Sequence, residues 1–143
     1  MRILAIFAVV FIVLMAYIRL APNKADTWHQ PSMLTGPGDY PEEGGFRVER
    51  RIAAPADDVL SRLRSIALAT PRTDILAGSV ESGLITFITR SRIMGFPDYT
   101  TASIYEDTLS IYGRLRFGRS DLGVNQARVQ AWLAQLDGMI EAS

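Results

Sequence analysis

Cysteine is absent from the 143 residues, and histidine occurs once, as His29. The missing cysteine excludes disulfides, thiolate nucleophiles and thiolate metal sites. His29 lies outside the region in which we expect a folded domain, so a histidine base is excluded there too, unless that segment folds back. Adjacent acidic pairs such as Glu42-Glu43 lack the spacing of metal ligands. We therefore expect a protein that is not an enzyme and has no catalytic residues, no cofactor and no metal.

An excess of charge of one sign is also missing. The 15 basic residues balance the 15 acidic residues. No overall field attracts nucleic acid or an anionic membrane surface to the whole molecule. Nucleic acid is therefore not an expected partner.

The chain contains one long hydrophobic run, at the N-terminus. Residues 3–18 include no charge, glycine or proline. As a helix, residues 3–20 span roughly 27 Å, which is close to the thickness of the hydrocarbon core of a bilayer. Pro22 then ends the helix. Residues 1–21 therefore predict a transmembrane anchor that contacts the lipid bilayer through residues 3–20.

A cleaved signal peptide is the alternative interpretation of this run. Cleavage requires small residues one and three positions before the cut, and a cut after Ala21 would place Arg19 at the third position. We favour a retained anchor. Arg2 and the terminal amine favour a cytoplasmic N-terminus, whereas Arg19 and Lys24 favour the opposite direction. We expect a single-pass protein of the bacterial inner membrane with its soluble domain in the periplasm.

Residues 22–45 are rich in proline and glycine and show neither a helical nor an alternating hydrophobic period. Such a composition predicts an extended tether rather than packed structure. Trp28, Met33 and Tyr40 interrupt its polarity. We interpret the aromatic residues as lying at the lipid headgroups or against the domain. A short docking segment for a neighbouring protein is the alternative.

Residues 46–143 are long enough for one domain with its own core. Residues 46–53 alternate, with Phe46 and Val48 on one face and charged residues on the other, which is typical of a strand. Four further strands are expected, because four segments are rich in β-branched or aromatic residues and bounded by glycine, proline or aspartate. These segments are residues 74–79, 84–94, 99–106 and 108–117.

Two helices complete the predicted domain. Pro55, followed by acidic residues in the first turn, predicts a helix that ends before Pro71. A second helix begins near Asn125 and carries Val129 and Trp132 on its apolar side. The order strand, helix, four strands, helix predicts an α+β domain, with an antiparallel sheet of about five strands and both helices packed on one face.

Two motifs lie between residues 91 and 136: Gly-Phe-Pro-Asp at 95–98 and Arg-Phe-Gly-Arg-Ser-Asp-Leu-Gly-Val-Asn at 116–125, with Arg128 on the helix that follows. In these motifs the chain resembles the bacterial domain-of-unknown-function family 1499. The family tends to carry Arg-Ser where this chain has Tyr-Gly at 112–113, and a second aspartate where it has Tyr99. The resemblance implies a family and no mechanism. The order of the elements is also similar to that of the ligand-binding START-like folds.

Arginines and carboxylates could form a binding face. Two predicted strands each carry two arginines spaced two apart, so if these strands are neighbours, four guanidinium groups share one side of the sheet and suit a carboxylate or phosphate. The favoured alternative is an arginine–aspartate network that holds loops and binds nothing. In the loop before the last helix we likewise favour Asp121 holding the turn and Asn125 capping the helix over an anion site. The candidate ligand or partner contacts are Arg90, Arg92, Asp98, Arg114, Arg116, Arg119, Asp121, Asn125 and Arg128.

Because a catalytic set is missing and an anchor is present, we expect a membrane-anchored, non-catalytic interaction protein. It would be an accessory subunit or factor that docks on a larger membrane complex, with a membrane protein as its partner. The alternative is a START-like binding module for a small acidic or lipidic ligand held between the sheet and the C-terminal helix. A hydrolase is the least favoured class.

Overall fold

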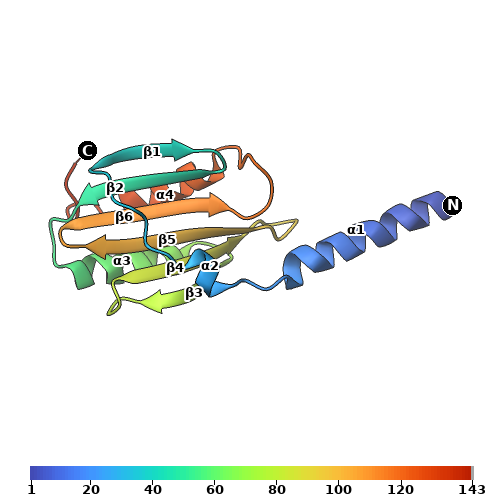
Figure 1. The fold of residues 1–143 in the computed structure, drawn as a ribbon, viewed down its shortest axis with the longest axis horizontal. Coiled ribbons are helices and arrows are strands. Elements are labelled where there is room, and N and C mark those ends of the chain that lie inside the picture. Colours follow the sequence, from blue (N-terminus) through green and yellow to red (C-terminus); the bar gives the residue numbers. More distant parts are fainter. Residues whose placement is uncertain (143) are drawn as a thin grey trace.

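The computed structural model describes residues 1–142, so Ser143, the last residue of the predicted domain, lies outside the described residues. One long helix projects from a layered domain (Figure 1). In chain order the elements are α1 (Arg2–Leu20), α2 (Ala25–Trp28), β1 (Gly38–Glu42), β2 (Gly45–Arg51), α3 (Ala56–Ala69), β3 (Thr73–Ser79), β4 (Leu84–Arg90), β5 (Pro97–Tyr105), β6 (Thr108–Leu115) and α4 (Val124–Ala134).

The strands form one antiparallel sheet in the order β1-β2-β6-β5-β4-β3. β3 to β6 pair successively along the chain, and β2 pairs with β6 across the sheet. The predicted α+β class, with an antiparallel sheet and two helices on one face, is confirmed. The sheet has six strands instead of about five, because β1 forms within the stretch that the sequence assigned to the tether.

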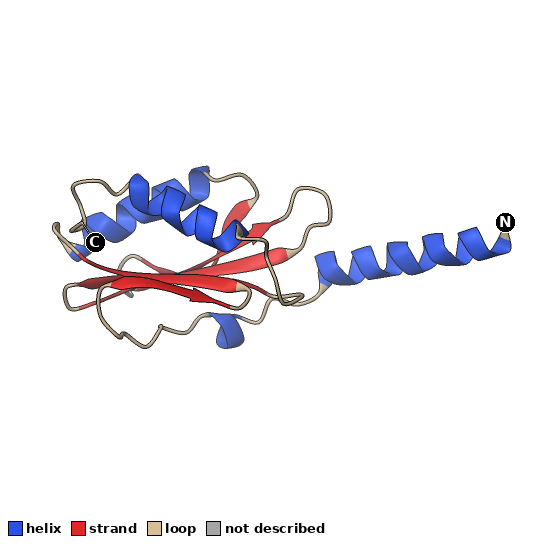
Figure 2. Cartoon of the chain, turned by 90° about the horizontal axis from the view of Figure 1, so that it is seen from above, coloured by secondary structure: helices blue, strands red, loops and turns tan. Residues whose placement is uncertain are grey.

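α3 and α4 cover one face of the sheet, and α2 with its flanking chain lies on the other (Figure 2). α3 begins after Pro55, and its acidic first turn, Asp57 and Asp58, complements the helix dipole. Its buried side chains recur at helical spacing, so one side of the helix packs on the sheet. They are Val59, Leu60, Leu63, Ile66 and Ala67.

The core lies between the sheet and these two helices. Trp132 of α4 meets Phe87 edge-on with 5.6 Å between ring centroids. Its Nε1 donates a hydrogen bond to Thr70 Oγ1 at 2.9 Å, so the one polar atom of this buried ring has a partner. The sheet contributes the alternating apolar side chains of β2 and β6, and the predicted inward face of residues 46–53 is confirmed. Fully buried core residues from the strands include Phe46, Val48, Ile85, Phe87, Ala102, Leu109 and Ile111.

Residues 22–45 are not the extended tether that the sequence predicted. β1 pairs with β2 along its whole length, from Gly38 opposite Glu49 to Glu42 opposite Gly45. The edge position of β1 accommodates Pro41, which cannot donate to a ladder. The segment before β1 packs on the sheet. The prediction was wrong because backbone pairing and bonds to single polar side chains hold this stretch, and neither leaves a hydrophobic period.

α1 is a 19-residue helix with a mean hydropathy of 2.7, and most of its side chains are exposed. This helix is long and apolar enough to cross a membrane, which is compatible with a membrane anchor and with a signal sequence. Its last turn contacts the domain: Ile18 is buried, and Arg19 Nη2 donates to the carbonyl of Ile93 at 2.9 Å. These contacts fix the domain against the end of the helix.

Candidate functional site

The sheet face opposite α3 and α4 is crossed by residues 23–36, which we call the strap (Figures 1 and 2). The strap contains α2 and connects the end of α1 to β1. Polar side chains from four strands make hydrogen bonds to it. These side chains belong to Arg47, Glu49, Thr86, Tyr99, Thr101, Arg114 and Arg116. The face on which the sequence placed a binding site is therefore occupied by the protein's own chain.

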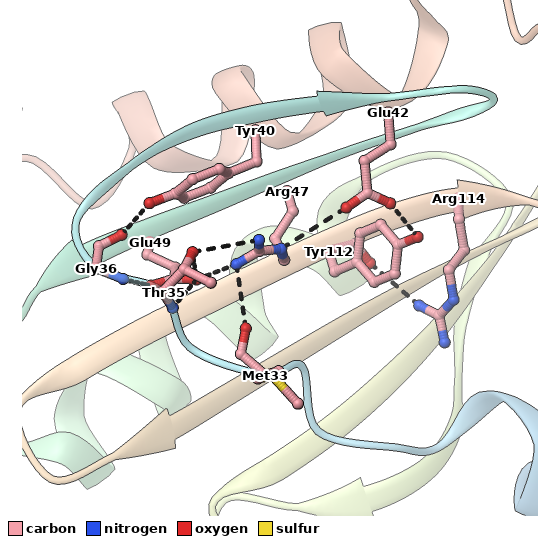
Figure 3. Close-up of polar contacts among 9 residues, drawn as sticks. All are labelled: Met33, Thr35, Gly36, Tyr40, Glu42, Arg47, Glu49, Tyr112 and Arg114. Atoms are coloured by element: carbon pink, nitrogen blue, oxygen red, sulfur yellow. Dashed lines mark hydrogen bonds and ion pairs between the residues drawn. The ribbon is translucent and has the colours of Figure 1, made fainter.

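Glu49 holds the C-terminal end of the strap. Its side chain is fully buried, at 0% exposure. The carboxylate accepts the backbone N–H of Gly36 at 2.8 Å and that of Thr35 at 3.1 Å, and it forms an ion pair with Arg47 (Figure 3). A buried carboxylate needs such partners because its removal from water is costly. Glu49 thus ties the strap to β2.

Arg47 extends this contact to β1. Its guanidinium lies 4.3 Å from the ring centroid of Tyr40 and donates to the carbonyl of Met33 at 3.4 Å. The hydroxyl of Tyr40 donates to the carbonyl of Gly36 at 2.6 Å (Figure 3). Tyr40 of β1 and Arg47 of β2 therefore both donate hydrogen bonds to the same end of the strap.

Trp28 holds the middle of the strap. Its ring stacks on that of Tyr99 with 4.1 Å between centroids and 17° between planes. Arg114 donates to the carbonyl of Trp28 at 2.5 Å and to Thr101 Oγ1 at 3.1 Å. Burial lowers the pKa of Arg114, although neighbouring Tyr112 opposes this shift. One of the predicted arginines therefore binds the strap.

Asn23, at the N-terminal end of the strap, binds Arg116, which lies just after the end of β6. Asn23 Oδ1 accepts hydrogen bonds from Arg116 Nη1 at 3.1 Å and from the hydroxyl of Tyr99 at 2.5 Å. Arg116 Nη1 also lies 3.2 Å from that hydroxyl. Arg114 and Arg116 thus both bind the strap where it crosses the sheet.

The sequence excluded a histidine base in the domain only if the segment around His29 stays away from it. In the structure this segment folds back, and His29 lies on the sheet. Its Nδ1 lies 2.9 Å from the hydroxyl of Thr86, which in turn lies 3.0 Å from that of Thr101. Thr86 has no exposed surface and Thr101 is 1% exposed. A substrate cannot reach either hydroxyl, so the arrangement serves packing rather than nucleophilic chemistry.

The two predicted arginine pairs do not share one side of neighbouring strands. β5 lies between β4 and β6, so Arg90 is separated from Arg114 of β6 and from Arg116, which follows that strand. Arg90 donates to the carbonyl of Gly95 at 3.0 Å and holds the loop after β4. Arg92 lies in that loop beyond the end of the strand and is exposed. The prediction that each pair lies on one strand was wrong, because β4 ends at Arg90 and β6 ends at Leu115, one residue before Arg116.

Asp98, Asn125 and Arg128 form a separate cluster on the helix side of the sheet. Arg128 donates to Asp98 Oδ2 at 3.4 Å and to Asn125 Oδ1 at 3.0 Å. Burial raises the pKa of Asp98, and the adjacent Arg128 only partly offsets this. Opposite the cluster, a Cβ on Gly113 would lie 2.8 Å from Asn125 Oδ1, so this position needs glycine. The cluster joins α4 to β5 and β6.

Asn125 does not cap α4, contrary to the prediction. The helix begins at Val124, and Asn125 is buried within its first turn. Asp121 binds the turn instead, because its carboxylate accepts the N–H of Gly123 and that of Asn125, each at 3.0 Å. Burial alone would raise the pKa of Asp121, but these backbone hydrogen bonds outweigh it and lower the pKa. The predicted role of Asp121 in holding the turn agrees with this geometry.

The family model described as protein of unknown function (DUF1499) matches residues 23–136. The chain belongs to this family. The match begins at Asn23, the first residue of the strap, and ends at Leu136, a fully buried core residue. The DUF1499 domain of this chain thus includes the strap and excludes α1. No curated protein matches the chain.

Several cavities border the strap of the DUF1499 domain, and two of them lie at opposite ends of the sheet. One, of about 660 Å³, lies toward α1 and is lined by three arginines, Arg114, Arg116 and Arg119, together with Trp28. The other, of about 520 Å³, lies at the opposite end of the sheet and has an apolar lining that includes Pro31, Leu34, Leu84, Ile104 and Tyr105. Within residues 1–142 no group of three or more His, Asp or Glu side chains could hold a metal ion.

Sequence reasoning missed the strap contacts because each of them joins residues far apart in the chain. Arg47, Glu49 and Arg51 stand at every second position of a strand, and charged residues at this spacing are typical of a solvent-exposed face. Trp28 next to His29 was the available signal, since large amphipathic side chains in a polar stretch need a surface to cover. The sequence could not identify that surface as the sheet.

We expect Glu49→Gln to loosen the strap. The substitution keeps the shape of the side chain and removes the charge that balances Arg47. The free energy of unfolding should fall by about 3 kcal/mol, as for other broken buried ion pairs, and the amides of Thr35 and Gly36 should exchange hydrogen faster. Denaturant titration and hydrogen exchange measure the two effects. Glu43→Gln, at an exposed turn, is the control, and slow exchange at Gly36 in the Glu49 variant would contradict this role.

Tyr112 should titrate at high pH. Burial, and then its hydrogen bond to Glu42 Oε2 at 2.6 Å, raise the pKa of Tyr112 to about 12. The folded state holds this proton more tightly than the unfolded chain, so the contribution to stability is complete below about pH 10 and is lost as the pH rises to about 12. Tyrosinate absorbance should show a step that Tyr112→Phe removes. Glu42→Gln should move the step to lower pH, and an unmoved step would exclude the role of Glu42.

Proposed function

We propose that this chain is a membrane-anchored, non-catalytic interaction protein, an accessory subunit or factor that docks on a larger membrane complex. The observation that carries the proposal is the apolar cavity at the end of the sheet away from α1. Its lining includes Leu34, Ile104 and Tyr105 and contains no charged side chain. Tyr105 is 67% exposed and the neighbouring strap residue Met33 is 85% exposed. Exposed apolar surface around a cavity suits a protein partner better than an acidic ligand.

The fixed position of the domain supports the same proposal. The strap is bound along the sheet, and the last turn of α1 contacts the domain through Ile18 and Arg19. The cavity therefore stands at a set distance from α1. An accessory subunit benefits from this arrangement because a partner in the same bilayer meets the cavity already oriented, which reduces the entropy lost on binding.

We further propose that the protein resides in the bacterial inner membrane with the domain in the periplasm. The support is the length of α1 and the positive N-terminus formed by the amine and Arg2. Alkaline phosphatase fused to the C-terminus should be active in cells, and green fluorescent protein fused there should stay dark. The reverse pair of results would exclude a periplasmic domain.

A second candidate is a binding module for a small acidic or lipidic ligand. The arginine-lined cavity favours it, since Arg119 makes no hydrogen bond or ion pair within the described residues and is exposed there. Packed core side chains fill the space between the sheet and α4. The arginine-lined cavity is therefore the better place for such a ligand. Arg114 and Arg116 already bind the strap, and for this reason we place this candidate second.

Purification in mild detergent followed by native mass measurement separates the two candidates. We expect the full chain to migrate with a larger assembly. Tyr105→Asp should abolish this association because it puts a charge beside the apolar cavity, whereas Leu68→Asp, on the exposed side of α3, should retain it. A monomer that carries a small additional mass would favour the ligand-binding module. A bare monomer, or equal loss in both variants, would exclude docking through this cavity.

A further inference from the structure

Two loops of the domain lie at the end of the sheet that faces α1 (Figures 1 and 2). One consists of residues 91–96, between β4 and β5, and the other of residues 117–123, which lie between β6 and α4. We call them the anchor-end loops. They contain most of the two motifs that the family resemblance singled out, and the strap contacts do not account for them.

The anchor-end loops contact the last turns of α1 directly. Arg19 Nη2 donates to the carbonyl of Ile93 at 2.9 Å. The ring of Phe117 lies 6.3 Å from that of Tyr17, in an edge-on arrangement, and 6.3 Å from that of Phe96. Tyr17 and Arg19 are the residues at which the apolar run ends, and such residues lie at the level of the lipid headgroups when a helix spans a bilayer. The loops that contact them are therefore at the same depth.

The loop tips expose large apolar side chains. Leu122 is 93% exposed and Ile93 is 78% exposed. Leu122 also has a φ of 54°, in the left-handed region that is uncommon for residues other than glycine. Neither side chain contributes to the domain core. Side chains of this kind gain free energy when they leave water for the interface of a membrane.

The same loops carry positive charge in a protein whose net charge is zero. Residues 91–96 contain Arg92 and no carboxylate, and residues 117–123 contain Arg119 with Asp121 as the only acid. Asp121 is engaged by the backbone of its own loop. Arg92 and Arg119 are exposed and make no hydrogen bond or ion pair within the part of the chain that the structure describes. Guanidinium groups at this depth suit lipid phosphates.

We propose that the anchor-end loops form a second membrane contact, which rests on an anionic bilayer surface. Ile93 and Leu122 enter the headgroup region, and Arg92 and Arg119 pair with lipid phosphates. The bilayer is the occupant because this apolar and basic surface is continuous with the end of α1. The depth of the loops, the exposure of Ile93 and Leu122 and the positive charge of Arg92 and Arg119 all favour the bilayer as the partner. The domain then lies on the membrane with its apolar cavity turned away from it.

The absence of cysteine allows single labels in the full chain. Ile93→Cys and Leu122→Cys report on the loops, Val10→Cys reports on the anchor, and Glu81→Cys, at the far end between β3 and β4, is the control. Each labelled protein is placed in vesicles of phosphatidylcholine with or without phosphatidylglycerol. A fluorophore on each cysteine is then exposed to a quencher on the lipid acyl chain near the headgroup and, separately, to iodide in the water.

We expect the lipid quencher to act on the labels at positions 10, 93 and 122, and iodide to act on the label at position 81. At positions 93 and 122 the lipid quenching should be stronger with phosphatidylglycerol. Arg92→Gln combined with Arg119→Gln should weaken this contact by about fivefold for each arginine, the factor expected for one charge near an anionic surface. Arg62→Gln combined with Arg64→Gln, on the exposed side of α3, is the matched control.

Three results would overturn the proposal. Iodide quenching at positions 93 and 122 as strong as at position 81 would show that the loops stay in water. Protection from both quenchers would indicate a protein contact, such as a second copy of the chain. Equal lipid quenching with and without phosphatidylglycerol would exclude the arginine contacts. If the label at position 10 also escapes the lipid quencher, α1 does not span the bilayer. That outcome is distinct from one in which only the loops stay away from the lipid.

Discussion

The buried carboxylate of Glu49, with its bonds to Arg47 and to the backbone of Thr35 and Gly36, is the contact on which the rest of the structure depends. A charge without exposed surface is stable in a protein only when hydrogen bonds and an opposite charge replace its water. Here the strap provides the hydrogen bonds. The strap must therefore stay on the sheet, and it covers a face that would otherwise present unpaired polar side chains to solvent.

This arrangement changes the role of the arginines. Arg114 and Arg116 have the spacing and chemistry of an anion site, but their guanidinium groups bind strap oxygens. A ligand would have to displace the strap to reach them, and this would also expose Trp28, which stacks on Tyr99. The surfaces that remain for partners lie at the two ends of the sheet. One end carries the apolar cavity, and the other carries the anchor-end loops.

The strap also determines how the domain is joined to α1. If residues 22–45 were an extended chain, they would reach about 80 Å, and the domain could move freely over the membrane. Bound across the sheet, the same residues add almost no length. The domain sits against Ile18 and Arg19 at the end of the helix. A partner in the membrane would thus meet a single orientation of the domain, because α1 and the domain are in contact.

The elements whose side chains repeat could be predicted from the amino-acid sequence alone. The apolar run of α1, the helical spacing of Val59 and Leu63 in α3, and the alternation of Phe46 and Val48 in β2 each record burial of one face, and burial of one face produces a period that can be read locally. The motif around Asp121 identified the family. The sequence also excluded cysteine chemistry, because that conclusion needs no geometry.

Which polar groups meet depends on how the strands and helices are arranged in three dimensions. β5 separates Arg90 of β4 from Arg114 of β6. Asp98 of β5 meets Arg128 because α4 packs on β6, the neighbour of β5 in the sheet. Glu49 is buried because a segment about 14 residues earlier returns to it. Each of these contacts depends on strand order or on a long chain crossing. A single hydrogen bond between distant residues leaves no repeat in the sequence, so the strap was read as a tether and its anchoring carboxylate as a solvent-exposed charge.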